Sequence, residues 1–102
     1  MQMNITARHC DISEELRDRA AIVLTRLADH MPRAVGGAVV FDNSPTAQAE
    51  IRLHSGRGEV FVATGEDKDH RSALDRAEEK VKRQMDKTNS LSRRPRSVKD
   101  GV

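Results

Sequence analysis

The stretch MQMNITARHCDISEELRDRAAIVLTRLADHM, residues 1–31, decides the fold, because its hydrophobic period changes partway along. In residues 1–9 apolar and polar side chains alternate, which is the period of a half-buried β-strand. Residues 11–31 instead repeat their apolar side chains at helical spacing, and Pro32 ends that pattern. A strand followed at once by an amphipathic helix predicts a sheet that carries the helix on one face.

The rest of the chain predicts three further strands and one further helix. The expected strands are VGGAVVF at 35–41, AQAEIRLH at 47–54 and EVFVAT at 59–64. The second helix is expected from about Lys68 to about Lys87, with Asp67 or Asp69 as its N-cap. The predicted fold class is therefore α+β, a β-α-β-β-β-α two-layer sandwich in which a four-stranded mixed sheet carries both helices on one face.

The chain has 102 residues, of which 36% are hydrophobic and 33% charged, and this suits one domain with a modest core. We expect an α+β domain over residues 1–90 and a basic, flexible tail over residues 91–102. The apolar stripes of the two helices should meet the sheet in the core. The side chains expected to be buried there are Leu16, Val23, Leu27, Leu74, Val81 and Met85.

The composition also predicts where the protein works and what it does not do. Cys10 is the single cysteine, so no internal disulfide can form, and no apolar run is long enough for a signal peptide or a membrane span. We expect a cytoplasmic protein with no membrane partner.

No histidine stands at metal-ligand spacing from Cys10 or another histidine, and no nucleophile has an evident base. The acidic residues at 66–69 are better explained as a helix cap than as a cation site. We therefore expect no enzyme activity, metal, cofactor or small-molecule substrate.

Positive charge is concentrated near the C-terminus. Residues 1–75 hold nine Lys or Arg and twelve Asp or Glu, whereas residues 76–102 hold nine and four. Four of the cations follow one another at helical spacings of four, three and four, and form the basic ridge: Arg76, Lys80, Arg83 and Lys87. In the tail, Arg93 and Arg94 continue the same polarity. This arrangement predicts a surface that docks a polyanion, and a merely solvated helix face is the alternative.

The expected polyanion is structured RNA, bound through its shape and backbone. The chain has no Trp and no Tyr, so base stacking of the kind used on single strands is not expected. The first helix is interpreted differently. Its arginines alternate with acidic residues and are taken as an ordinary solvated face: Arg17, Arg19 and Arg26.

The order and spacing of several short motifs resemble the bacterial hibernation-promoting factor family, in its short form. This family is also called the ribosome-associated inhibitor or sigma-54 modulation family. The motifs are the opening MQMNITARH, ISEELR at 12–17, EDKD at 66–69, ALD at 73–75 and KVKRQM at 80–85.

The resemblance implies the same β-α-β-β-β-α fold and binding to the small ribosomal subunit and its RNA. The implied position is between the head and the body of the subunit, where the protein would block the mRNA and tRNA sites of idle ribosomes. Implied RNA contacts are Lys80, Arg83 and Lys87, with Arg8 as a weaker match. The older family name leaves a second hypothesis open, that of a protein-binding regulator of sigma-54-dependent transcription.

Two pairs of residues depart from the family pattern. His70 and Arg71 replace an apolar or aromatic pair, while Ala77 and Glu78 stand where bulky apolar residues are usual. We therefore expect the second helix to pack on the sheet through a thinner apolar face.

Overall fold

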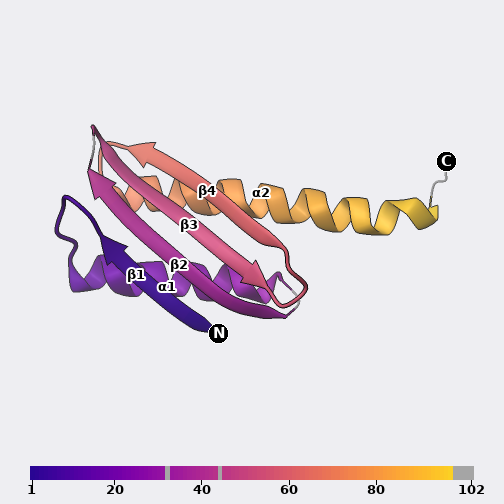
Figure 1. Cartoon of the computed structure of the whole chain (residues 1–102). Coiled ribbons are helices and arrows are strands. Elements are labelled where there is room, and N and C mark those ends of the chain that lie inside the picture. The colour runs from indigo at the N-terminus through magenta and orange to yellow at the C-terminus, as the bar shows by residue number, and fades with distance from the viewer. Residues whose placement is uncertain (32, 44, 98–102) are drawn as a thin grey trace.

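The computed structural model contains four strands and two helices in the predicted order β-α-β-β-β-α (Figure 1). It describes residues 1–31, 33–43 and 45–97, and the side chains among them up to residue 87. The elements are β1 (Gln2–Ala7), α1 (Glu14–Asp29), β2 (Ala34–Asn43), β3 (Ala47–Ser55), β4 (Val60–Asp67) and α2 (His70–Ser97).

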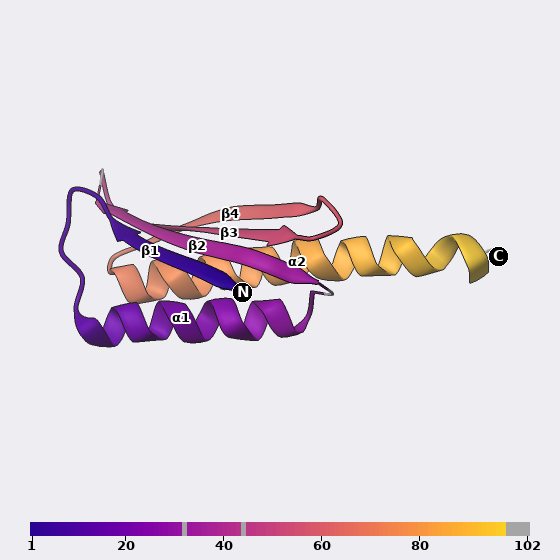
Figure 2. The same cartoon turned by 60° about the horizontal axis from the view of Figure 1, so that its bottom comes forward.

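The four strands form one mixed sheet in the order β1-β2-β3-β4. β1 pairs with β2 in parallel, whereas β2, β3 and β4 form an antiparallel meander. Both helices lie on the same face of this sheet, and the opposite face is left uncovered (Figure 2). The predicted two-layer architecture is therefore confirmed, and β1 and β4 are the two edge strands.

The core lies between the helices and the covered face of the sheet. Its largest fully buried side chains include Phe41, Leu24 and Ile51. Five of the six side chains predicted to be buried are buried: Val23, Leu27, Leu74, Val81 and Met85. Leu16 is only partly buried, because it lines an open groove between the N-terminal ends of α1 and α2.

β4 and α2 approach each other very closely at Gly65. A Cβ atom on this residue would lie 2.7 Å from the backbone nitrogen of Ala77, and closer still to the carbonyl oxygen of Ala73. Only a glycine facing small residues permits such an approach. The expected thinness of the apolar face at Ala77 is therefore compensated, because the helix backbone itself fills the space and Ala77 is fully buried.

The N-terminal end of α2 shows which acidic residue caps it. The Asp69 carboxylate accepts a hydrogen bond from the backbone N–H of Ser72 at 2.8 Å, which is the geometry of an N-cap. Asp67 belongs to β4 and pairs with Arg76 instead. Of the two candidates named from the sequence, Asp69 is thus the cap.

The C-terminal end of α2 differs from the prediction. The helix continues to Ser97, ten residues past the expected end at Lys87, and its last turns extend beyond the sheet (Figures 1 and 2). Residues 88–94 contain neither Gly nor Pro, so none of them stops a helix that has already formed against the sheet. The division into a domain over 1–90 and a flexible tail over 91–102 stays a prediction, and residues 98–102 lie outside the described part.

Candidate nucleic-acid interface

The structure divides the basic ridge into two parts with different surroundings. The first part, Arg76 and Lys80, contacts the outer edge of β4. Lys80 donates from Nζ to the Thr64 carbonyl oxygen at 2.8 Å, and the Arg76 Nε lies 2.6 Å from an Asp67 carboxylate oxygen. Both cations remain exposed to solvent, but each already has an anionic or carbonyl partner within the molecule.

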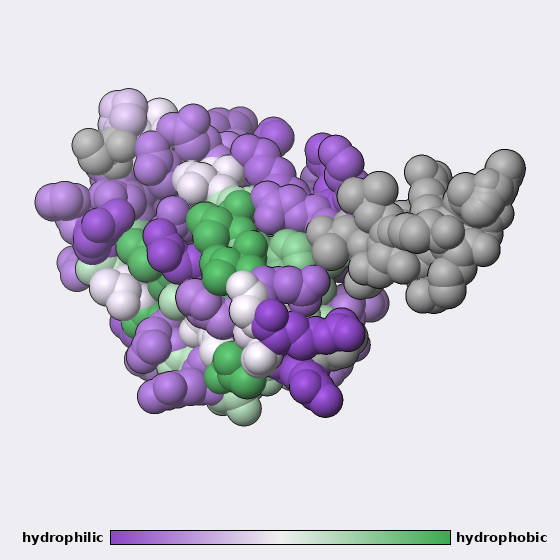
Figure 3. Space-filling model, turned by 45° about the vertical axis from the view of Figure 1, so that its right-hand side comes forward, coloured by the Kyte–Doolittle hydropathy of each residue, from purple (hydrophilic) through white to green (hydrophobic). Residues whose placement is uncertain are grey.

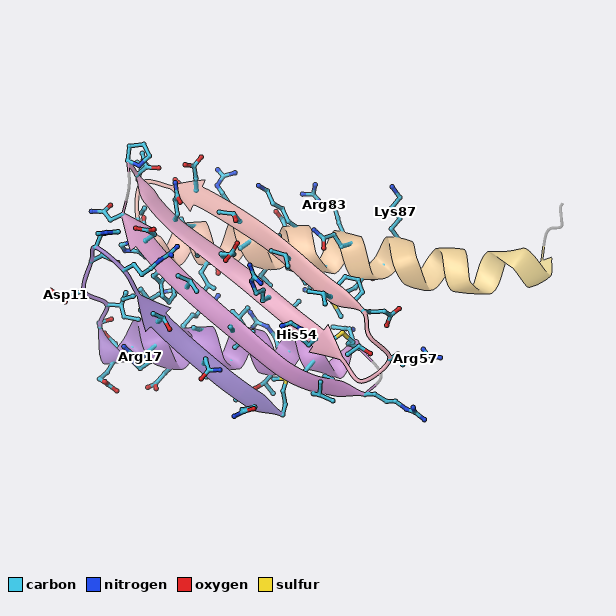
Figure 4. All side chains as sticks on the ribbon, in the orientation of Figure 1. Asp11, Arg17, His54, Arg57, Arg83 and Lys87 are labelled. Atoms are coloured by element: carbon cyan, nitrogen blue, oxygen red, sulfur yellow. The ribbon has the colours of Figure 1, made fainter. Side chains whose placement is uncertain are left out.

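The second part of the ridge, Arg83 and Lys87, is free of the sheet. Both side chains extend from α2 past the β4 edge into solvent (Figure 4). Arg83 lies 3.8 Å from Glu79, and these two side chains are 76% and 72% exposed, so solvent weakens the pair strongly. Among the described residues, the Lys87 ammonium group has no ion-pair partner. These two cations are therefore the part of the ridge best able to bind an external anion.

The contact between Arg76 and Asp67 shifts the pKa of both groups. The pKa of Asp67 lies below its ordinary value of 3.8, first because Arg76 donates a hydrogen bond to it and second because the Lys68 backbone N–H does so. The same contact raises the pKa of Arg76. Arg76 therefore acts mainly as the partner of Asp67.

Arg8 does not lie with the ridge. It follows β1, whereas the ridge lies beside β4, and these strands are opposite edges of the sheet. The Arg8 guanidinium is 3.4 Å from an Asp42 carboxylate oxygen, and His9 Nδ1 is 3.1 Å from the other. The hydrogen bond with His9 is the main reason that the pKa of Asp42 is lowered, followed by the Asn43 backbone N–H. The structure thus places Arg8 in a separate cluster at one end of the sheet.

The two tail arginines predicted as RNA contacts, Arg93 and Arg94, fall in the extended part of α2, where the backbone but not the side chains is described. Residues 82–97 contain six Lys or Arg and one Asp, which leaves a formal charge of +5 on the end of this helix. Positive side chains also suit a helix C-terminus, because the helix dipole places negative charge there. The strongest basic region of the chain is therefore the end of α2.

The interpretation of the first-helix arginines as a solvated face is wrong. Arg17 donates to the Ile5 carbonyl oxygen at 3.0 Å, and Arg19 pairs with Asp75 at 3.2 Å. Arg26 makes two hydrogen bonds of 3.0 Å to the Glu78 carboxylate. All three are structural because α1 lies beside α2 and β1, a proximity that charge alternation along one helix cannot show. The charged residue at position 78 was the available signal, since a buried carboxylate requires a partner.

Other kinds of site find no support in the described part of the chain. No group of three or more His, Cys, Asp or Glu residues there could hold a metal ion. No helix in the same residues is long and apolar enough to cross a membrane. A groove of about 410 Å³ lies between the N-terminal ends of the helices, but its lining includes Arg19 and Arg71 together with Glu15 and Asp69. Charges of both signs give it no preference for a cation or an anion.

Comparison with known proteins gives a consistent family. The family model described as Sigma 54 modulation protein / S30EA ribosomal protein matches residues 3–91. A protein of Pseudomonas putida named Ribosome hibernation promoting factor is 32% identical over 88 residues, which cover 85% of this chain and 85% of that protein. A protein of Azotobacter vinelandii with the same name is 33% identical over 86 residues, covering 83% and 79% respectively.

Solved structures show the same fold. The crystal structure of the Thermus thermophilus Protein Y N-terminal domain matches with a TM-score of 0.75 and 26% identity, covering 86% of this chain and 99% of that one. A ribosomal subunit interface protein from Coxiella burnetii also gives a TM-score of 0.75, with 20% identity over 88% of this chain and 99% of that one. The second likeness concerns the fold alone.

Proposed function

Since this chain belongs to the Sigma 54 modulation protein / S30EA ribosomal protein family, we propose that it is a ribosome hibernation factor. The family and its curated relatives are named for association with the ribosome and for hibernation, and not for a reaction, so the chain is a binding protein and not an enzyme. The partner in this proposal is the small ribosomal subunit with its RNA, and the place of action is the cytoplasm.

The proposed mechanism is steric exclusion held in place by electrostatic docking. The protein lies between the head and the body of the small subunit, where its volume blocks the mRNA and tRNA sites of idle ribosomes. No bond is made or broken, and the affinity comes from Lys and Arg side chains that replace counterions along RNA phosphates. The concentration of positive charge at the end of α2 suits this kind of docking.

One observation supports this mechanism most strongly. Beyond Lys80, α2 carries two exposed cations, Arg83 and Lys87, and Arg83 has only a solvent-weakened pair with Glu79 (Figure 4). The last turns of the same helix extend past the sheet (Figure 1). Lys80 is a third contact, since an ammonium group has three donors and the Thr64 carbonyl takes one of them. Arg76 contributes to RNA binding only through its electrostatic field, because its guanidinium is paired with Asp67. Arg93 and Arg94 extend the same basic end, and Arg8 lies too far across the sheet to share it.

Co-sedimentation with purified small subunits at several salt concentrations tests this proposal. The variant Arg83→Glu/Lys87→Glu should bind much more weakly than the wild type. Its plot of log affinity against log salt should also be flatter, by about one unit for each phosphate that the variant no longer neutralises. The matched control is Arg57→Glu/Lys68→Glu, which makes the same charge change at exposed residues outside α2.

The two variants together give a clear decision. If the control loses as much affinity as the α2 variant, net charge alone governs binding and the docking surface is not the end of α2. If neither variant weakens binding, the phosphates are bound elsewhere on the protein. Capture of an RNA polymerase subunit that survives ribonuclease and high salt, with no binding to ribosomes, would favour regulation of sigma-54-dependent transcription instead.

A further inference from the structure

We propose that Lys80 and Gln84 block the outer edge of β4, so that this strand cannot pair with a second copy of this chain. β4 is an edge strand, so the peptide groups on its outer side have no neighbouring strand. Such a row of N–H and C=O groups is a template to which another extended chain can add. In this protein two long side chains from α2 reach that row first.

The contacts are regular along the strand. Lys80 donates to the Thr64 carbonyl oxygen at 2.8 Å, and Gln84 donates from Nε2 to the Val62 carbonyl oxygen, also at 2.8 Å. Because Val62 and Thr64 are two residues apart in a strand, their carbonyl groups point to the same side. Two successive outward carbonyl groups of β4 are therefore occupied.

The spacing of the helix matches the spacing of the strand. Residues four apart on an α-helix lie roughly 6 Å apart along its axis, and residues two apart on a strand lie roughly 6.5 Å apart. Lys80 and Gln84 therefore each stand opposite one carbonyl group of β4. Arg76, one turn earlier on α2, continues the row by pairing with Asp67 at the end of the strand. Long charged side chains, above all lysine, are an effective block to strand addition.

The other edge of the sheet carries the same arrangement. Arg17 of α1 donates to the Ile5 carbonyl oxygen of β1 at 3.0 Å, in a partly buried position. Each helix thus sends a long side chain to the edge strand nearest to it. A contact of the same kind therefore occurs at both edges of the sheet, made by a different helix at each edge.

The sequence of β4 shows why protection is needed. The β4 sequence VFVATGED contains no proline. On the sheet face that no helix covers, it carries two β-branched apolar side chains, Val60 and Val62, which are 51% and 36% exposed. An unprotected β4 could pair with the β4 of a second molecule, which would extend the sheet and shield these valines in both copies. On the side of the molecule that Figure 3 draws, apolar residues lie in several separate areas with hydrophilic residues between them. Protection of the edge therefore removes strand pairing as a way to shield these two valines.

The experiment compares the wild type with Lys80→Ala/Gln84→Ala by sedimentation equilibrium over a range of protein concentrations, without ribosomes. The wild type should remain a monomer of 11.4 kDa. The double variant should show a doubling or more of its weight-average mass at concentrations where the wild type is still monomeric. Lys82→Ala and Lys87→Ala, which remove a charge from α2 without touching β4, should behave as the wild type. Circular dichroism confirms that each variant is folded, and the single substitutions Lys80→Ala and Gln84→Ala take the place of the pair if it is not.

A third substitution locates the association. Val62→Pro removes an outward N–H of the edge strand, so adding it to Lys80→Ala/Gln84→Ala should restore the monomer. A monomeric double variant, a wild type that associates equally, or association that survives Val62→Pro would each overturn the inference. No ribosome enters this measurement, so its failure leaves the proposed function untouched, and loss of ribosome binding by other variants leaves this inference untouched.

Discussion

The Glu78 carboxylate accepts two hydrogen bonds of 3.0 Å from the Arg26 guanidinium and so joins α2 to α1. The Glu78 side chain is 10% exposed, whereas that of Arg26 is 45% exposed. Glu78 is therefore a buried charge whose partner reaches it from the solvent side. This pair occupies a position where the family resemblance suggested bulky apolar packing, and it replaces an apolar contact between the helices with a polar one.

Replacing Glu78 or Arg26 by Ala should reduce the free energy of unfolding by about 2 kcal/mol, because each substitution removes a charge-assisted pair of hydrogen bonds. Arg26→Glu should cost more than Arg26→Ala, since it places two carboxylates together. The exchanged pair Arg26→Glu/Glu78→Arg should recover part of that loss. Urea denaturation of the four variants and the wild type measures these differences, and an Arg26→Ala variant as stable as the wild type would show that the pair contributes nothing.

A methyl group at Gly65 should lower the free energy of unfolding far more than a methyl group at Gly36 of the same sheet. Gly65→Ala forces α2 away from β4, because the new Cβ would meet the backbone of Ala73 and Ala77. We expect a loss of about 3 kcal/mol, at the upper end of the usual cost of overpacking. The control is Gly36→Ala, whose Cβ would make an ordinary contact of 3.6 Å with the Gln2 carbonyl oxygen. Thermal melts that move equally for both variants would contradict the close approach.

The close approach at Gly65 is a feature that the sequence pattern does not predict. The period of the apolar residues was enough to predict every element, the sheet and the common face of the helices. The predicted strand at 59–64 ended one residue too early to include Gly65, because the acidic residues that follow, Asp67 and Asp69, favour the start of a helix. Pairing of Gly65 with Ala49 of β3 extends β4 instead. Such pairing depends on a neighbouring strand, which the local pattern does not contain.

The candidate site was predictable to a similar degree. Helical spacing was sufficient to place Arg76, Lys80, Arg83 and Lys87 on one stripe of α2. It could not show that Arg76 and Lys80 are turned toward β4 while Arg83 and Lys87 remain free, because that difference depends on how the helix crosses the strand. For the same reason the structural contacts of Arg17 were missed, since its carbonyl partner on β1 is set by tertiary packing.

The stability of the protein should fall in acid through three aspartates. The pKa values of Asp42, Asp67 and Asp69 are lowered from 3.8 by hydrogen bonds from His9, Arg76 and Ser72 respectively. A lowered pKa in the folded state means that the unfolded chain binds protons more tightly, so this contribution is complete above the ordinary pKa and is lost as the pH falls through the folded value. Because of these three groups, we expect the melting temperature to decrease when the pH is lowered below about 4.

The substitution Asp67→Asn isolates one of these groups. It removes the carboxylate partner of Arg76, so its melting temperature should lie below that of the wild type at neutral pH. The two melting temperatures should converge as the pH falls below the lowered pKa of Asp67, because the carboxylate of the folded wild type is then protonated as well. A difference that stays constant with pH would mean that the substitution acts through packing and not through charge.

Removing residues 91–102 should leave the melting temperature nearly unchanged, because the end of α2 extends beyond the sheet (Figure 1). The same truncation removes Arg93 and Arg94, so binding to small subunits should weaken and depend less on salt. Differential scanning calorimetry and co-sedimentation measure the two effects on one sample. A large fall in melting temperature would show that this segment belongs to the folded domain.

Single alanine substitutions along α2 should separate the two parts of the basic ridge. Arg83→Ala and Lys87→Ala should each weaken binding to small subunits with little change in the melting temperature, since both side chains lie in solvent. Lys80→Ala should weaken binding less, because Thr64 already holds one of its donors. Arg76→Ala should weaken binding least, because it removes a charge that Asp67 largely neutralises, and it should lower the melting temperature most clearly of the four. Affinity from co-sedimentation and melting temperature from circular dichroism, measured on the same four proteins, check this order. Equal losses of affinity at all four positions would mean that RNA binding breaks the contacts with β4 and engages the ridge as one surface.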